Sequence, residues 1–381
     1  MRLQPASKAT FASASVTGRR VGQSCFYILT LLLAQAYLSP ALGESLSTGD
    51  GDLRVMTYNA NEGTDFLEVQ QATNSFEFLV AVGQTITQVR ATNPPERMQA
   101  LAKQIIKASP ALVGVQELDQ WATGSFDPTT SSCGPTTLEF DMLQELQDAL
   151  AAQGAHYQLA VQAQQYAFPP IPGLTASGFL CVAVVNNIAV LARTDLDARK
   201  FQWSNPQSGQ YINMLLFPTP LGTLPLPRAW ASVDAISHGR AFRFITSHLE
   251  SVVPAIREAQ GAELRNGPAN TPLPVVIAMD SNAQAAPLPQ DSTYVDFRVA
   301  GYRDVWSKIL PSVAGLTCCQ AELDNNPVSQ LYQRIDLILT HGRVSGQNIA
   351  LYGANPSTRT ADGLWPSDHA GVAAQLAIGD E

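Results

Sequence analysis

Apolar and polar side chains alternate with a two-residue period at residues 53–58, which is typical of a half-buried strand. Residues 112–116 carry few polar side chains, as a strand covered on both faces does. Shorter apolar runs predict further strands along the rest of the chain. These lie at 157–161, 188–192, 211–217, 242–247, 275–279, 335–340 and 372–376.

A helical period appears between these strands. From Pro94, apolar residues recur at the spacing of one buried helix face, and Ser109-Pro110 ends the helix. A second helix is predicted over 138–150, whereas residues 64–92 have no assigned fold. The proline-rich segments 168–172 and 218–227 are predicted to be surface loops at a substrate rim. Roughly ten strands with a few helices predict one α/β (α+β) domain, with sheets packed face to face and helices outside.

The first 43 residues are predicted to be a secretion signal. Arg19 and Arg20 precede an apolar run at 26–38, and small residues at 41–43 suit signal peptidase. The run is shorter than the ~20 residues of a spanning helix, which disfavours the alternative of a membrane anchor. We therefore expect a signal at 1–43, a linker at 44–52, a folded domain at 53–381, and a secreted or periplasmic protein without a transmembrane segment.

Charge narrows the classes of partner. Without residues 1–43 the chain keeps 19 basic and 32 acidic residues, a net charge of −13. Non-specific nucleic-acid binders neutralise phosphates with Lys and Arg, so this balance argues against one. The negative charge is still compatible with a metal-dependent enzyme that acts on phosphodiesters, since a bound cation supplies local positive charge.

Four cysteines remain beyond the predicted signal, a number that suits an oxidising compartment. Cys318 and Cys319 are adjacent, and a trans peptide holds their Cα atoms about 3.8 Å apart, which disfavours a bond between them. If two bridges form, we therefore expect each to join Cys133 or Cys181 to the 318/319 pair. A metal site is the alternative, but the absence of C-x₂-C spacing disfavours zinc.

Polar residues of metal-ligand or acid/base type directly follow several of the apolar runs, so they should meet at one sheet edge. They are Asn59, Glu117, His248, Asp280, Asn282, Asp336, Asp368 and His369. Ser367, Asp368 and His369 are consecutive, and neighbouring strand residues point to opposite faces, so they cannot form a serine-protease triad. No G-x-S-x-G segment occurs in the chain.

These segments resemble the endonuclease/exonuclease/phosphatase superfamily, with the deoxyribonuclease I-like fold, and suggest a secreted, bacterial-type member. The matches are Thr57-Tyr58-Asn59, 113–117, Ser247-His248-Leu249, 278–282, Tyr302-Arg303-Asp304, Arg334-Ile335-Asp336 and Ser367-Asp368-His369. Met279 departs from the glycine that many members carry before the aspartate. The resemblance implies a four-layer sandwich: two packed, mostly antiparallel sheets flanked by helices.

The resemblance also implies residue roles. Glu117 is the principal metal carboxylate, with Asn59 and Asp368 beside it, and these oxygen ligands suit Mg²⁺, with Mn²⁺ or Ca²⁺ as alternatives. His369 is the catalytic histidine and Asp336, expected on an adjacent strand, its carboxylate partner. Asp280 is the other residue able to activate the water.

Supporting roles follow from the same resemblance. Asn282 and His248 donate to phosphate oxygens. Asp304 and Arg334 are either catalytic supports or a structural ion pair, and Ser367 is a turn or capping residue.

The implied function is a secreted, metal-dependent phosphoesterase acting on phosphodiesters, with no further cofactor and no obligate protein partner. The alternatives are a secreted nuclease acting on DNA or RNA, a sphingomyelinase- or phospholipase C-like enzyme, and a catalytically silent binding module. Loops, and not the catalytic set, decide between nucleic acid, phospholipid headgroups and small esters.

Overall fold

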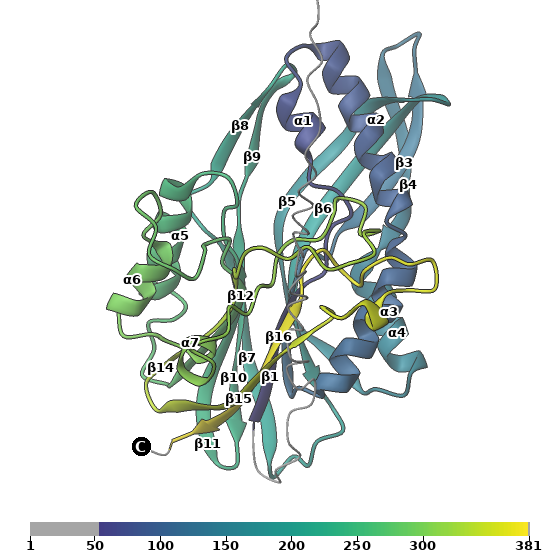
Figure 1. The fold of residues 1–381 in the computed structure, drawn as a ribbon. Coiled ribbons are helices and arrows are strands. Elements are labelled where there is room, and N and C mark those ends of the chain that lie inside the picture. Colours follow the sequence, from purple (N-terminus) through teal and green to yellow (C-terminus); the bar gives the residue numbers. More distant parts are fainter. Residues whose placement is uncertain (1–52, 380–381) are drawn as a thin grey trace, which may run out of the picture. The chain divides into compact units, whose positions relative to one another are not determined.

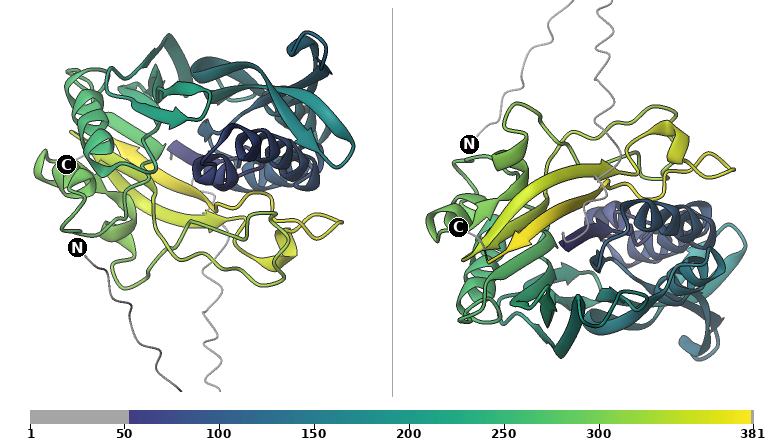
Figure 2. Two further views of the ribbon diagram at one scale, coloured as in Figure 1. Left: turned by 90° about the horizontal axis from the view of Figure 1, so that it is seen from above. Right: turned by 90° about the horizontal axis from the view of Figure 1, so that it is seen from below.

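The computed structural model describes residues 53–379. The predicted signal and linker, together with the last two residues, lie outside this range. Two large sheets pack face to face, and a separate two-stranded hairpin stands beside them (Figure 1). Each large sheet carries helices on its outer face, as two further views show (Figure 2).

The larger sheet has eight strands and contains both ends of the described chain. In order across the sheet they are β15 (Val344–Tyr352), β16 (Gly371–Ile378), β1 (Leu53–Asn59), β2 (Leu112–Gln116), β6 (Gly178–Arg193), β3 (Gln120–Asp127) and β4 (Ser132–Asp141), with β5 (Tyr157–Thr175) also paired to β6.

The smaller sheet has six strands drawn from the second half of the chain. They are β13 (Arg303–Asp304), β14 (Asp336–His341), β12 (Val275–Asp280), β11 (Arg240–His248), β10 (Ala229–Ser237) and β7 (Phe201–Gln210). The separate hairpin consists of β8 (Leu215–Thr219) and β9 (Gly222–Leu226).

Helices cover the outer faces. The larger sheet is covered by α2 (Ser75–Ala91), α3 (Pro94–Ala108) and α4 (Met142–Ala152), and the smaller by α5 (Pro254–Asn266) and α6 (Thr293–Val299). Short helices α1 (Leu67–Gln71), α7 (Val305–Ile309) and η1 (Pro356–Thr358) complete the set.

Apolar side chains fill three interfaces between the four layers. Val55, Val190, Phe244 and Ile338 come from both sheets and pack between them. The predicted helix face of α3, including Met98, packs against the outer face of the larger sheet. Two strand pairs, β1 with β2 and β11 with β12, are parallel, and the remaining pairs are antiparallel. The predicted sandwich of mostly antiparallel sheets is confirmed.

Several predicted elements differ from the structure. The helix predicted over 138–150 begins only at Met142, because β4 extends to Asp141 and pairs with β3. The strand predicted over 211–217 begins at Leu215. The segments 168–172 and 218–227 are not plain loops, since the first lies inside β5 and the second contains the end of β8 and all of β9. Proline is tolerated there because β5 is bulged at 168–171 and β8–β9 has two open edges.

The predicted disulfide pairing is wrong. Cys133 on β4 joins Cys181 on β6, with a Cα–Cα distance of 5.8 Å that lies in the usual disulfide range. Cys318 is bonded to Cys319, across a peptide that is cis, so the trans distance on which the prediction relied does not apply. Among residues 53–379, no helix has the length and apolar character needed to cross a bilayer.

Candidate functional site

Strand register brings the predicted polar residues to one place. In the larger sheet, parallel pairing aligns Asn59 with Gln116, so Glu117 follows at the same strand end. In the smaller sheet, His248 is paired with Asp280 and Asp280 with Asp336. Because β16 runs antiparallel to β1, the segment before β16 also lies at this end and brings Asp368 and His369.

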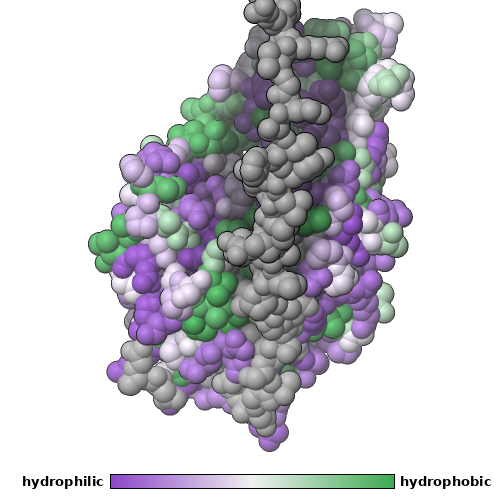
Figure 3. Space-filling view, viewed as in Figure 1, coloured by the Kyte–Doolittle hydropathy of each residue, from purple (hydrophilic) through white to green (hydrophobic). Residues whose placement is uncertain are grey.

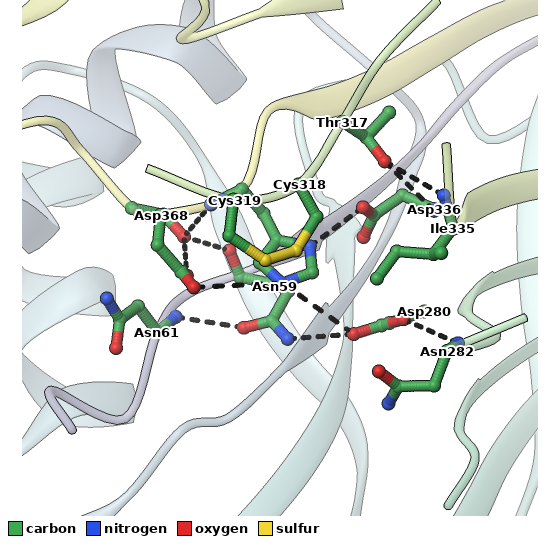
Figure 4. Close-up of a disulfide and its surroundings, with 12 residues drawn as sticks. Asn59, Asn61, Asp280, Asn282, Thr317, Cys318, Cys319, Ile335, Asp336 and Asp368 are labelled. Carbon is green, nitrogen blue, oxygen red and sulfur yellow. Dashed lines mark hydrogen bonds and ion pairs between the residues drawn. A yellow bond between two sulfur atoms is a disulfide. The ribbon is translucent and has the colours of Figure 1, made fainter. Parts of the chain in front are cut away.

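These strand ends surround a polar hollow of about 750 Å³. Its lining includes Glu117, His248, Asp280, Asn282, Asp368 and His369. The two sheets contribute different parts of this lining, so the site is formed by their packing and by neither sheet alone. Figure 4 shows Asn59, Asp280, Asp336 and Asp368 around the Cys318–Cys319 bond.

Asn59 links two carboxylates at the centre of the site. Its Nδ2 donates to Glu117 Oε1 at 2.7 Å and to Asp280 Oδ2 at 3.0 Å. Its Oδ1 accepts from the backbone N–H of Asn61 at 2.9 Å, which fixes the orientation of the amide. Glu117 has a left-handed backbone with φ of 57° and accepts the Glu62 backbone N–H through Oε2. In this orientation Asn59 holds Glu117 and Asp280 close together.

His369 and Asp336 form a buried hydrogen-bonded pair. Nδ1 of His369 lies 2.8 Å from Asp336 Oδ2, and the side chains are 6% and 0% exposed. Burial alone would lower the pKa of His369, but Asp336, Asp368 and Asp280 raise it well above its ordinary value. The expectation of adjacent strands is wrong, because Asp336 begins β14 of the smaller sheet whereas His369 precedes β16 of the larger sheet. The pair meets because the two sheets face each other.

His248 is a neutral histidine of defined tautomer. Burial, followed by the nearby Arg228 and His369, lowers its pKa well below the ordinary value. Nδ1 lies 3.2 Å from both Gln165 Nε2 and Arg228 Nη1, and both of these atoms are donors. Nδ1 therefore accepts, and Nε2 carries the proton. That N–H lies 3.6 Å from Glu117 Oε1 and 3.5 Å from Asp280 Oδ2.

The carboxylates of this hollow repel one another. Burial, and then the charge of Asp336, raises the pKa of Asp280 to about 6, although His369 opposes the shift. Burial, with a contribution from Glu117, also raises the pKa of Asp368. Oxygens of Glu117 and Asp280 lie within 4.8 Å of each other and of the His248 ring nitrogen. A compact group of carboxylate oxygens fits a hard divalent cation such as Mg²⁺ or Mn²⁺.

Comparison with known proteins gives a match in structure and none in sequence. No family model and no curated protein sequence matches the chain. An endonuclease/exonuclease/phosphatase family protein from Leptotrichia buccalis C-1013-b aligns with a TM-score of 0.52 and 14% identity, over 86% of this chain and 100% of that one. TDP2 from D. rerio, in a complex with a single-strand DNA product, aligns with a TM-score of 0.50 and 17% identity, over 86% and 100%. The chain has the endonuclease/exonuclease/phosphatase fold. A conserved protein of unknown function from Enterococcus faecalis V583 aligns similarly, with a TM-score of 0.50, 15% identity, and 86% and 100% coverage.

Within this endonuclease/exonuclease/phosphatase fold, Asp304 and Arg334 lie outside the lining of the polar hollow. Arg334 Nη2 donates to Asp304 Oδ2 at 2.9 Å, and Asp304 Oδ1 accepts from the Trp306 backbone N–H at the start of α7. Both side chains are buried. Their contacts are those of a buried ion pair that caps a helix.

Two other predicted residues, Ser367 and Asn282, form hydrogen bonds with the backbone. Ser367 Oγ donates to the Asn59 carbonyl at 2.7 Å and accepts the His369 N–H at 3.0 Å, so it holds the loop beside β1. Asn282 Nδ2 donates to the Leu249 carbonyl at 2.9 Å. An amide nitrogen carries two hydrogens, so this bond uses one of them.

Sequence reasoning missed the residues that support the site from remote positions. Arg97 on α3 is fully buried and donates to the carbonyls of Ala60 and Asn61, at 2.7 and 2.9 Å, directly after β1. Arg228 follows β9 and contacts His248. Arg97 had a weak signal, as a charged residue within the apolar face of a helix. Arg228 directly follows a proline-rich segment and has no local pattern that indicates a site.

Proposed function

We propose that this protein is a secreted, divalent-cation-dependent phosphoesterase that hydrolyses phosphodiester bonds. The observation that supports it best is the convergence of a carboxylate group, a neutral histidine donor and a His–Asp pair in one hollow. Glu117, Asp280 and Asp368 are the residues that would hold the cation, with Asn59 positioning the first two. Mg²⁺ is the proposed ion, and Mn²⁺ or Ca²⁺ are the alternatives. When bound, such an ion offsets the negative charge of the phosphoryl oxygens.

The protein groups around the hollow have complementary roles in this proposal. His248 Nε2–H donates to a non-bridging phosphate oxygen, where charge builds up during the reaction. His369 is oriented by Asp336, and its Nε2 lies 4.0 Å from Asp280 Oδ2. A water molecule held between His369 and Asp280 can lose its proton to the Asp280 carboxylate, or to His369 when its imidazole is neutral. Comparing the pH–rate profiles of His369→Ala and Asp280→Asn would identify the acceptor.

Export is part of the same proposal. The predicted signal at 1–43 lies outside the described residues, and the Cys133–Cys181 bond is consistent with an oxidising compartment. Expression of the full chain in a bacterial host, followed by N-terminal sequencing of the exported product, tests this part. Cleavage near residue 43 is the expected result.

Hydrolysis is tested with the purified full chain on bis(p-nitrophenyl) phosphate, supercoiled plasmid DNA and sphingomyelin, each with Mg²⁺, Mn²⁺ or Ca²⁺. We expect turnover of at least one substrate that EDTA abolishes and that His369→Ala lowers strongly. Activity that survives both treatments contradicts the mechanism. A folded protein that hydrolyses none of the three would favour the alternative of a catalytically silent binding module.

A further inference from the structure

A second hollow, of about 720 Å³, adjoins the polar one. The two share Glu62, Asp65, Arg228 and Ser251 in their linings. A molecule whose phosphate lies in the polar hollow can therefore extend directly into the second.

Two opposite walls of the second hollow are apolar. One wall comes from Phe66, which precedes α1, from Val69 of α1 and from Phe168 of β5. The opposite wall is the β8–β9 hairpin, where the cross-strand pairs Leu215–Leu226 and Phe217–Leu224 line the hollow.

The hairpin belongs to neither large sheet. A two-stranded hairpin is marginally stable alone, so it depends on cover for its apolar face. Leu215, Phe217, Leu224 and Leu226 are half-buried, whereas Leu216 on the opposite face is 61% exposed. Apolar surface gathers over this hairpin, at the upper left of Figure 3. An apolar ligand in the hollow would cover the inner face and bury more of these side chains.

Positive charge is scarce along both hollows. Within the described part of the chain, their linings include one arginine, Arg228, and no lysine. Its side chain is 11% exposed and lies where the hollows join, with Nη2 donating to Ser251 Oγ at 3.1 Å. Polymeric nucleic acid is bound by several Lys or Arg residues along successive phosphates. A single arginine beside an apolar hollow fits a ligand with one phosphate group and an apolar chain.

From this geometry we infer that the second hollow binds the apolar chain of the substrate, and that the substrate is an amphiphilic phosphate ester. This inference rests on the proposed phosphoester hydrolysis and names its substrate class. The phosphate lies in the polar hollow near Arg228, and the chain lies between α1 and the β8–β9 hairpin.

Binding of ethyl, butyl, hexyl and octyl phosphate tests this, measured by titration calorimetry with Mg²⁺ on the full chain carrying His369→Ala. All four are used below their micelle-forming concentrations, so that one chain and not a lipid surface is presented. We expect affinity to rise about fourfold for each methylene group that is buried. Phe217→Asp should flatten this dependence, and Val69→Asp on the opposite wall provides a second variant if the first fails to fold.

Leu216→Asp is the matched control, because it places the same charge on the outer face of the same strand and should keep the chain-length dependence. Affinity that is independent of chain length overturns the inference. The inference is also overturned if adenosine monophosphate binds more tightly than octyl phosphate and Phe217→Asp weakens the binding of adenosine monophosphate. In that case the second hollow would accept a nucleobase. Binding is measured without turnover, so failure of the inference and failure of hydrolysis on bis(p-nitrophenyl) phosphate are separate outcomes.

Discussion

Replacing Asp336 by Asn removes a charge from the site and keeps the shape of the side chain. The Asp336 carboxylate accepts from His369 Nδ1 at 2.8 Å, and both residues are buried. A hydrogen bond to a charged group contributes about 1.5–3 kcal/mol net. If that stabilisation is lost only in the transition state, each 1.36 kcal/mol lowers the rate tenfold, so kcat should fall roughly 10- to 150-fold.

The assay is hydrolysis of bis(p-nitrophenyl) phosphate with Mg²⁺, followed across pH. Because Asp336 raises the pKa of His369, its loss should also move the limb of the profile that reports His369 to lower pH. Asp304→Asn is the control, since it removes another buried carboxylate that pairs with Arg334 outside the hollow. It should lower the melting temperature and leave kcat of the folded protein unchanged. Full activity in Asp336→Asn, with an unshifted profile, would refute the proposed role of the pair.

Three further results are expected. Mg²⁺ should raise the melting temperature of the wild type, because an ion at a hundred times its Kd stabilises the folded state by about 2.7 kcal/mol. Glu117→Gln should lose most of that gain. An equal shift in both proteins would exclude Glu117 as a ligand. Burial raises the pKa of Glu145 from 4.5 to about 7, so ionisation of this side chain costs folding stability as the pH rises between these values. In urea unfolding, Glu145→Gln should therefore stabilise the protein at pH 8 and have almost no effect at pH 4. The same gain at both pH values would contradict this. Non-reducing peptide mapping should link Cys133 to Cys181, whose loss costs about 2–4 kcal/mol of stability; a peptide linking either residue to 318–319 would show another pairing.

The pattern of apolar and polar residues along the sequence predicted those helices and strands whose side chains are buried in a regular way. The strand at 112–116 is uniformly buried and mostly apolar because helices cover one face and the second sheet the other. Helix α3 shows its period because one of its faces packs on the larger sheet. The pattern failed where strands are exposed or bulged. In β7, most side chains are exposed, so no alternation marks it as a strand.

The sequence by itself determined which residue types end the buried strands, and thus that Glu117, His248 and Asp280 would lie at strand ends. Only the tertiary structure decided how they meet. His369 pairs with Asp336 because two sheets face each other, and the tautomer of His248 depends on Arg228, which follows a separate hairpin. The physical reason is that periodicity records whether one element's face is buried, whereas contacts between elements depend on register and packing between segments remote in sequence.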